Sequence, residues 1–329
     1  MAFNSPFWNP SEASAILFDW DGVIADTKLD FSEVKLKYYG DRSVMLLEDA
    51  VTLTPESRES LMRDLEDLEV CGAENASLVP GVPAILEWFE KLDIPWAVVS
   101  RNCRKSILTS AKRIGVTLPR VVRSRDDGDR VKPDPEALLE VCAQLGANAA
   151  DTLLIGDYIY DMMGARRAGM RGILVRKTIQ DDWDQWLECH YTSMYEFFDG
   201  LSNHAEITAW EYRDVHRQYG ADFLRKVHAI MLPIPEQASP NIDSWVSRAA
   251  SHGVGGFIVR DGKLTPEIWR QNPSLSIEYM GMPMEMVLRN FLQNRWPFAK
   301  VIRDQKDVEM SAPPGDADHL AEYLLSLVS

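Results

Sequence analysis

The stretch Ala15–Asp26, AILFDWDGVIAD, joins a run of apolar residues to two closely spaced acids. The run Ala15–Phe18 is typical of a buried β-strand. Asp19 and Asp21 follow at its end, with Gly22 directly behind them. Two carboxylates at this spacing in an extended segment point the same way and repel, so a bound cation, or a division of labour between nucleophile and proton carrier, makes the pair useful. The alternative is an ordinary polar Asp-Gly turn after a strand.

Three further motifs place polar residues after apolar runs. AVVS at 97–100 ends in Ser100, and Lys132 lies in VKPDP, where two prolines restrict the backbone. The apolar run Leu153–Ile155 leads into GDYIYD at 156–161, which contains Asp157 and Asp161. The carboxyl ends of parallel strands form the edge of an open α/β sheet where ligands bind. We therefore expect the acids, the hydroxyl and the lysine to meet at that edge.

With DWDG, Ser100, KPDP and GDYIYD in this order, the chain up to about residue 200 resembles the haloacid dehalogenase superfamily, in its phosphatase branch. KPDPEALL and GDYIYDMMGARRAGM are similar to its phosphoglycolate-phosphatase-like subfamily. The dehalogenase branch lacks the second aspartate, so Asp21 favours phosphoryl transfer. The resemblance implies a Rossmann-like, three-layer α/β core with a parallel sheet and a small helical cap insert.

The same resemblance implies a Mg²⁺-dependent phosphatase that hydrolyses a small phosphorylated metabolite through an aspartyl-phosphate. Asp19 is the expected nucleophile, Asp21 the acid and base, Lys132 the charge neutraliser and Ser100 a phosphoryl ligand. Further phosphate contacts are expected near Trp20, Arg101 and Asn102. Mg²⁺ is expected between Asp19, the backbone carbonyl of Asp21 and Asp157, with Asp161 supporting the shell.

Two alternative functions stay open. FDWDGVIADT is similar to the sugar-phosphomutase form of the first motif, but Lys28–Gly40 lacks the histidine that those enzymes share. The chain could also be a phosphatase module coupled to a C-terminal domain that binds a protein partner or a ligand. The substrate contacts in the cap are undecided among four basic residues: Lys28, Lys35, Lys37 and Arg42.

Apolar periodicity divides the chain into three parts. Residues 1–26 and 79–201 form the expected catalytic core, with strands at 96–99, 120–123, 152–155 and 172–175 separated by helices. Residues 27–78 form the expected cap, because leucines at helical spacing and no strand pattern occur there, with helices at 31–39 and 44–50 besides the leucine-rich one. Residues 202–329 form a separate α/β domain of unknown role, with expected strands at 227–232, 255–260 and 298–302 and helices at 242–250, 284–292 and 316–327.

The composition excludes several classes of protein. A net charge of −15 argues against non-specific binding to nucleic acid or anionic membranes. The 4 cysteines are far apart and without a Cys-x-x-Cys pair, which indicates free thiols. The first residues carry no signal-peptide pattern, and no apolar run is long enough to span a bilayer. We expect a cytoplasmic enzyme.

Overall fold

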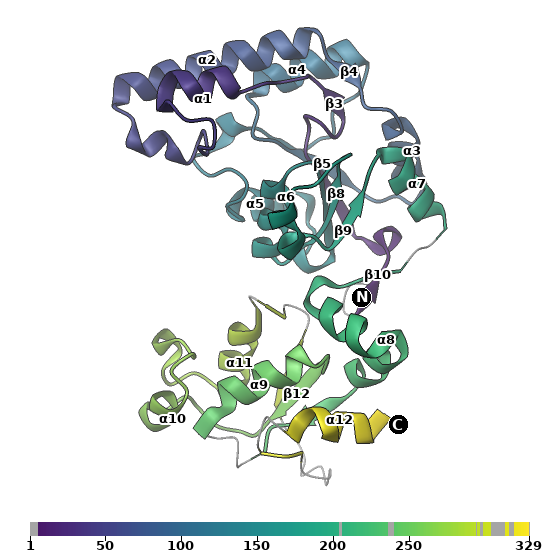
Figure 1. Ribbon diagram of the computed structural model, residues 1–329, viewed down its shortest axis with the longest axis vertical. Coiled ribbons are helices and arrows are strands. Elements are labelled where there is room, and N and C mark those ends of the chain that lie inside the picture. Colours follow the sequence, from purple (N-terminus) through teal and green to yellow (C-terminus); the bar gives the residue numbers. More distant parts are fainter. Residues whose placement is uncertain are drawn as a thin grey trace. The chain divides into compact units, whose positions relative to one another are not determined.

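The computed structural model describes residues 6–203, 206–235, 240–293, 295–296, 299–303, 313–315 and 319–328. The chain forms two compact units, one of residues 13–205 and one of residues 206–329 together with the segment that ends at Glu12 (Figure 1). The first unit, called here the larger unit, contains all four sequence motifs.

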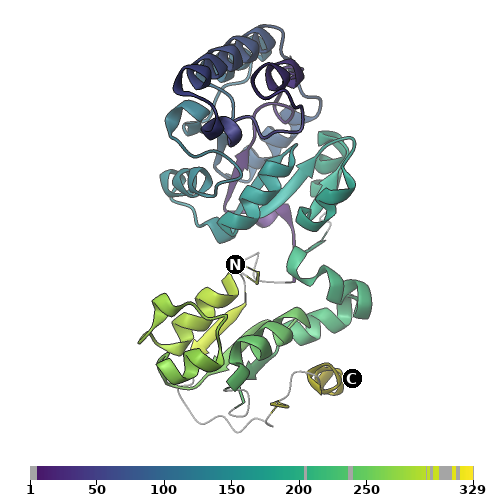
Figure 2. The ribbon, with the colours of Figure 1, turned by 60° about the vertical axis from the view of Figure 1, so that its left-hand side comes forward.

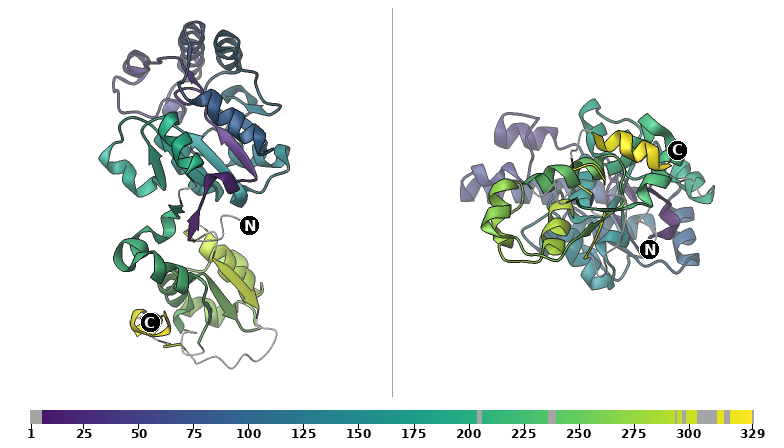
Figure 3. Two further views of the ribbon diagram at one scale, coloured as in Figure 1. Left: turned by 90° about the vertical axis from the view of Figure 1, so that its right-hand side faces the viewer. Right: turned by 90° about the horizontal axis from the view of Figure 1, so that it is seen from below.

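The larger unit is built on a six-stranded sheet with the order β6-β5-β2-β7-β8-β9. Its strands are β2 (Ala15–Phe18), β5 (Trp96–Val99), β6 (Val122–Arg123), β7 (Thr152–Gly156), β8 (Arg171–Val175) and β9 (Cys189–Tyr191). Every neighbouring pair is parallel, as expected. Figure 3 shows β2, in purple, among the later strands of this sheet. The carboxyl ends of β5, β2 and β7 therefore lie side by side.

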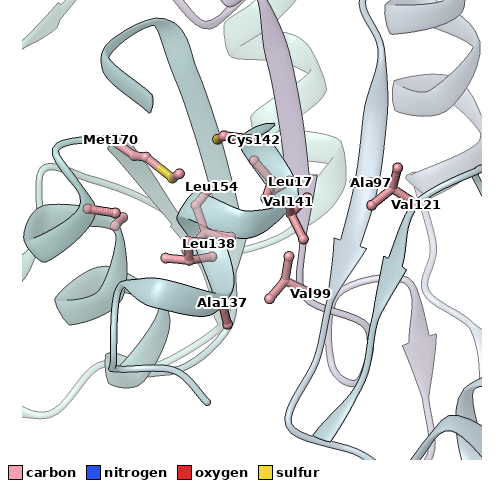
Figure 4. Close-up of a cluster of buried hydrophobic side chains, with 12 residues drawn as sticks. Leu17, Ala97, Val99, Val121, Ala137, Leu138, Val141, Cys142, Leu154 and Met170 are labelled. Carbon is pink, nitrogen blue, oxygen red and sulfur yellow. The ribbon is translucent and has the colours of Figure 1, made fainter. Parts of the chain in front are cut away.

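Helices cover both faces of this sheet, because alternate side chains of each strand point to opposite faces. On one face Leu17, Val99 and Leu154, from three neighbouring strands, meet Leu138 and Val141 of α5 (Glu136–Leu145) (Figure 4). On the other face Phe18 packs edge-on against Phe89 of α3 (Val82–Lys91), with ring centroids 6.3 Å apart. The remaining helices of the core are α4 (Arg104–Ile114), α6 (Ile159–Ala168) and α7 (Met194–Ser202). The expected three-layer core is confirmed.

The segment after the first motif is helical, as the leucine spacing predicted. It contains α1 (Ser32–Tyr39), the short 3-10 helix η3 (Asp49–Thr52) and the long helix α2 (Pro55–Glu74), which Figures 1 and 2 show running beside α1. The Thr54 side chain accepts a hydrogen bond from Ser57 N–H and so caps α2. We call residues 27–76 the helical insert. It is bracketed by a short antiparallel pair, β3 (Ala25–Asp26) and β4 (Ser77–Leu78).

Some predicted elements were wrong or too long. The helix expected at 44–50 is a series of turns that leads into η3. The strand expected at 120–123 is only Val122–Arg123, and β9 was not predicted. In the second unit a strand was expected at 227–232, but its first two residues are the end of helix α8 (Arg213–His228). Val227 is buried on this helix together with Val215 and Leu224, and all three face Gly253.

The second, smaller unit has a three-stranded parallel sheet of β11 (Met231–Pro233), β12 (Gly256–Val259) and β13 (Lys300–Arg303). Its helices are α8, α9 (Ile242–Ser251), α10 (Pro266–Gln271), α11 (Met284–Gln293) and α12 (Leu320–Val328). Phe298 and residues 316–318, which belonged to a predicted strand and helix, lie outside the described residues. The expected second α/β domain is present.

The chain begins in this smaller unit, which differs from the expected boundary. Strand β1 (Phe7–Trp8) pairs antiparallel with β10 (Ile207–Thr208), and Trp8 is only 1% exposed. The core therefore starts at Ala13 and not at the first residue, because burial of Phe7 and Trp8 ties the N-terminal segment to residues that follow 205.

All four cysteines are free thiols. Within the described ranges, none of the helices combines the length and the apolar character that a bilayer crossing requires.

Candidate active site

Lys132 joins two of the predicted acids. Its Nζ lies 2.9 Å from Asp19 Oδ1 and 2.7 Å from Asp161 Oδ1, and its side chain is 1% exposed. Asp19 follows β2, Asp161 lies in the first turn of α6, and Lys132 comes from the segment between β6 and α5. Burial lowers the pKa of Lys132, but the two carboxylates outweigh burial and the net direction is upward. Lys132 is therefore held as a cation beside Asp19.

Asp157 completes an acidic group. Asp19, Asp157 and Asp161 each offer a carboxylate oxygen, and these oxygens lie within 4.8 Å of one another. Burial raises the pKa of Asp157 well above its usual range; Asp19 and Asp161 raise it further, and Arg176 opposes them. Arg176 Nη1 lies 3.4 Å from Asp157 Oδ2, so two basic side chains, Lys132 and Arg176, face three carboxylates. A bound cation would relieve the negative charge that remains.

Two glycines make room for these acids. Gly22 has φ +75°, and a Cβ there would lie 2.4 Å from Asp157 Oδ2. A Cβ at Gly156 would lie 2.2 Å from Asp161 Cγ. Both distances are far below ordinary van der Waals contact, so side chains at these positions would displace the carboxylates.

Asp21 lies outside this group of three carboxylates and is bonded to Thr27. Asp21 Oδ1 accepts hydrogen bonds from the backbone N–H of Thr27, at 3.0 Å, and from its hydroxyl. Burial raises the pKa of Asp21 to about 6, although both hydrogen bonds lower it. A carboxyl group with this pKa is protonated at mildly acidic pH, well above the range in which an ordinary aspartate holds its proton. Sequence reasoning missed Thr27, whose only signal was its place directly after the first motif.

The loop after β5 carries the other predicted phosphate ligands. The backbone N–H of Asn102 donates to Ser100 Oγ at 3.2 Å. Arg101 donates to both carboxylate oxygens of Glu48, at 2.6 and 3.0 Å, and stacks over the Tyr160 ring. Glu48 belongs to the insert and Tyr160 to α6, so the side chain of Arg101 is held from both the insert and the core.

Trp20 contributes its backbone to the site. Its N–H donates to Asp19 Oδ1 at 2.7 Å, and its fully buried indole donates to Ser110 Oγ at 2.7 Å. The indole anchors the first motif to α4, so the side chain is structural and only the backbone faces the chemistry.

A pocket of about 520 Å³ is lined by the insert on one side and, on the other, by residues of the first motif, of the loop after β5 and of the segment 157–161. Ser100 and Lys132 are not among its lining residues. Its acidic floor includes Asp19, Asp21, Asp157 and Asp161, and Arg101 and Asn102 also line it. Of the four basic residues left undecided, Lys35 and Arg42 line the pocket, whereas Lys37 pairs with Asp64 on the outer surface. Apolar walls come from Leu29, Phe31, Leu46, Leu47 and Leu65.

A buried ion pair joins the insert to the core beside this pocket. Arg125 donates to Glu69 Oε1 at 2.5 Å and to Oε2 at 3.1 Å, and both side chains are at least nine-tenths buried. The Cys103 N–H also donates to Glu69. Sequence reasoning missed the pair, yet Glu69 continues the four-residue spacing of buried Leu61 and Leu65 on α2, and an acid on an apolar stripe signals a buried partner.

Most of the basic residues that follow the second motif are paired with acids. Arg104 pairs with Asp127, Lys105 with Glu66 and Arg123 with Glu140. These pairs offset the local positive charge, so these basic side chains do not form a free basic patch.

The chain is similar to several known proteins. Residues 16–175 match the family model described as haloacid dehalogenase-like hydrolase. N-acetylmuramic acid 6-phosphate phosphatase of Pseudomonas aeruginosa is 29% identical over 184 residues, which are 49% of this chain and 81% of that protein. Pyrophosphatase PpaX of Halalkalibacterium halodurans is 25% identical over 189 residues, 52% of this chain and 87% of that protein. Among solved structures, a hydrolase from Pseudomonas syringae has a TM-score of 0.49 and 20% identity, covering 58% of this chain and 99% of that one.

Proposed function

We propose that this chain, whose residues 16–175 form a haloacid dehalogenase-like hydrolase domain, is a phosphatase that hydrolyses a small phosphorylated metabolite through a phosphorylated Asp19. The observation that carries the proposal is the contact of Lys132 with Asp19 and Asp161 on the floor of a pocket, with Asp157 beside them. An aspartate held by a buried lysine beside further acids is suited to attack an anionic phosphoryl group, because the lysine offsets the charge of both.

Asp19 Oδ2 is the attacking oxygen, because Oδ1 accepts hydrogen bonds from Trp20 N–H and pairs with Lys132. It forms a bond to phosphorus as the bond from phosphorus to the leaving oxygen breaks. The leaving oxygen keeps the electron pair and takes the proton of Asp21. Asp21, now ionised, accepts a proton from water, whose oxygen attacks phosphorus and releases Asp19 and inorganic phosphate. Ser100 and the backbone N–H groups near Trp20 and Arg101 hold the phosphoryl oxygens.

The residues fit a bound Mg²⁺ ion. Asp19, Asp157 and the backbone carbonyl of Asp21 would hold it, and their hard oxygen atoms suit this cation. Asp161 is already engaged by Lys132 and by Tyr158 N–H, so it would support the site without direct ligation. The ion would supply charge neutralisation for the phosphoryl oxygens.

The helical insert is proposed to act as the cap of the site. It supplies one wall of the pocket, and Lys35 and Arg42 are the basic side chains of that wall that are placed to meet the part of the substrate beyond the phosphoryl group. A cap over the site would exclude water during phosphoryl transfer.

A phosphomutase is the less favoured alternative. Among the described residues that line the pocket there is no histidine, in keeping with its absence from Lys28–Gly40. We propose that the smaller unit is a separate module that binds a protein partner or a ligand.

The test is a screen of phosphorylated metabolites with Mg²⁺, using the full-length protein and Asp19→Asn. We expect the wild type to release inorganic phosphate and the variant to lose at least about 10³-fold in kcat, because a carboxamide is a poor nucleophile. Metal-dependent turnover that persists in Asp19→Asn would contradict the assigned nucleophile.

A further inference from the structure

Glu69 is a buried acid of the insert whose two carboxylate oxygens both accept hydrogen bonds from the core. Arg125 donates to Oε1 at 2.5 Å and to Oε2 at 3.1 Å, and the backbone N–H of Cys103 donates to Oε2 at 2.7 Å. The side chain of Glu69 is 2% exposed and that of Arg125 is 8% exposed. An arginine that bonds to both oxygens of a carboxylate fixes the direction of the two groups as well as their distance.

These contacts hold the loop that follows β5. Arg125 Nη1 donates to the carbonyl oxygen of Arg101 at 3.0 Å, and the backbone N–H of Arg125 donates to the carbonyl oxygen of Asn102, also at 3.0 Å. With the Cys103 N–H included, three successive residues of the loop have a backbone group that is bonded to Glu69 or to Arg125. The path of the loop therefore depends on this ion pair.

The same loop carries proposed phosphoryl ligands. It begins with Ser100, whose hydroxyl oxygen accepts a hydrogen bond from the Asn102 N–H at 3.2 Å. A shift of the backbone at 101–103 would therefore move Ser100 and the neighbouring N–H groups relative to Asp19. A misplacement of about 1 Å at such groups is sufficient to slow a reaction by about 10²-fold.

The insert is fixed to the core at the same place. The Ser106 hydroxyl on α4 donates to the carbonyl oxygen of Glu69 at 3.1 Å, and Glu69 lies among the buried residues of α2 with Leu61 and Leu65. A well-packed apolar pair would stabilise such an interface about as well as a buried ion pair does. Stability alone therefore does not explain an acid here, whereas its contacts with the loop do.

We propose that Glu69 is a positioning residue for phosphoryl transfer, which holds the loop at 100–103 through Arg125 and through the Cys103 N–H. The order of this loop then depends on the seating of α2 against the core. The inference rests on the proposed phosphatase function and adds to it a residue that acts through the loop. Its consequence is that a neutral side chain at position 69 weakens the binding of the phosphoryl group itself, whichever alcohol is attached.

The experiment measures inhibition by orthovanadate, an anion that imitates the transferring phosphoryl group and has no alcohol part. With Mg²⁺ and 4-nitrophenyl phosphate as the substrate, we expect Glu69→Gln to lose between about 10-fold and 100-fold in kcat/KM. The inhibition constant for orthovanadate should rise by a similar factor. Arg125→Lys keeps a cation for Glu69 but lacks the planar guanidinium, so it should change both quantities in the same direction.

Glu188→Gln is the matched control. The Glu188 side chain is 3% exposed and accepts from Arg171 Nη1 at 2.9 Å and from the backbone N–H of Gly172 at 3.3 Å, so its partners are of the same kinds as those of Glu69. Glu188 is not among the residues that line the pocket. This variant should unfold at a lower temperature but keep the kcat/KM and the orthovanadate inhibition constant of the wild type. Unfolding midpoints from circular dichroism set a temperature at which the compared variants are folded.

Wild-type values of both quantities in Glu69→Gln, or an equal rise of the orthovanadate constant in Glu188→Gln, would overturn the positioning role. So would a loss of kcat/KM with unchanged orthovanadate inhibition, because Glu69 would then act on the leaving alcohol and not through the loop. If Glu69→Gln does not fold, the same measurements on Arg125→Lys decide the question. Failure of the underlying function looks different: the wild type would release no phosphate from any ester, 4-nitrophenyl phosphate included.

Discussion

Lys132 Nζ lies 2.9 Å from Asp19 Oδ1, inside a site where the lysine is 1% exposed and also contacts Asp161. Replacing it with methionine keeps the volume but leaves Asp19 and Asp161 without the cation that pairs with both. We expect Lys132→Met to lose at least about 10³-fold in kcat and to be less stable by about 3–5 kcal/mol without metal. Mg²⁺ should raise the unfolding midpoint of this variant more than that of the wild type, measured by differential scanning calorimetry.

The matched control is Lys37→Met, whose side chain is 61% exposed and pairs with Asp64 at the surface. It should leave the unfolding midpoint close to that of the wild type, because an exposed ion pair contributes little to stability. An equal Mg²⁺ response in Lys132→Met and wild type would argue against a cation site beside Lys132.

Asp21 should act as a proton donor mainly below pH 6, because burial raises its pKa to about 6. Hydrolysis of ethyl phosphate, whose alkoxide needs a proton, should therefore slow as the pH rises through 6. Release of 4-nitrophenolate from its phosphate ester should not slow, because this group leaves without a proton. Single-turnover experiments between pH 5 and 8 measure the release rates of ethanol and of 4-nitrophenolate. In Asp21→Asn the loss should be larger for ethyl phosphate, and equal losses for the two esters would exclude Asp21 as the acid.

The same shift predicts that Asp21 weakens the folded state at high pH. Its pKa rises from 3.8 to about 6 on folding, so the native state binds the proton more tightly and loses stability as the pH rises from about 4 to 6. Asp21→Asn, which cannot ionise, should therefore be more stable than the wild type at pH 8, by up to about 3 kcal/mol. The difference should vanish below pH 4. Urea titration in EDTA at both pH values tests the sign, and a larger gain at pH 4 would refute it.

Gly22→Ala and Gly40→Ala separate backbone strain from contact with the site. Both glycines have positive φ, +75° and +67°, so each alanine costs about 1 kcal/mol in the backbone. Only at Gly22 does the new Cβ meet a carboxylate, 2.4 Å from Asp157 Oδ2, while nothing lies within 4 Å at Gly40. We expect Gly22→Ala to raise the Mg²⁺ concentration needed for half-maximal activity, and Gly40→Ala to leave it unchanged. If Gly22→Ala and Gly40→Ala needed the same Mg²⁺ concentration for half-maximal activity, the placement of Asp157 against Gly22 would be contradicted.

A fragment of residues 13–205 should fold and keep the proposed phosphatase activity, since the region that matches the family model and all motif residues lie within it. A fragment of residues 1–205 should aggregate more, because Phe7 and Trp8 lose the β10 strand that pairs with them. Light scattering and turnover of 4-nitrophenyl phosphate compare the two. An inactive, unfolded 13–205 fragment beside an active 1–205 fragment would show that the boundary is misplaced.

Local pattern was sufficient to predict the parallel sheet and the meeting of Asp19, Asp157 and Asp161 at one of its edges. Apolar runs that end in Asp19, Ser100 and Asp157 predict strand ends, and parallel strands bring those ends to one edge whatever the connections are. The prediction of a strand at 227–232 was wrong in its first residues because Val227 is buried on a helix. A short apolar run does not distinguish the helical repeat of 3.6 residues from the strand repeat of two. Strand β9 escaped prediction because Cys189–Tyr191 is only partly buried and carries no alternating apolar pattern.

The sequence by itself determined which residues can carry phosphoryl chemistry, because residue type and the order of strands and turns are local properties. Only the tertiary structure decided which partners surround them: Thr27 on Asp21, Glu69 on Arg125, and Lys35 and Arg42 rather than Lys37 facing the pocket. It also assigned Phe7 and Trp8 to the smaller unit. Such contacts join segments that are distant along the chain, and their geometry follows from packing and burial, which no local pattern encodes.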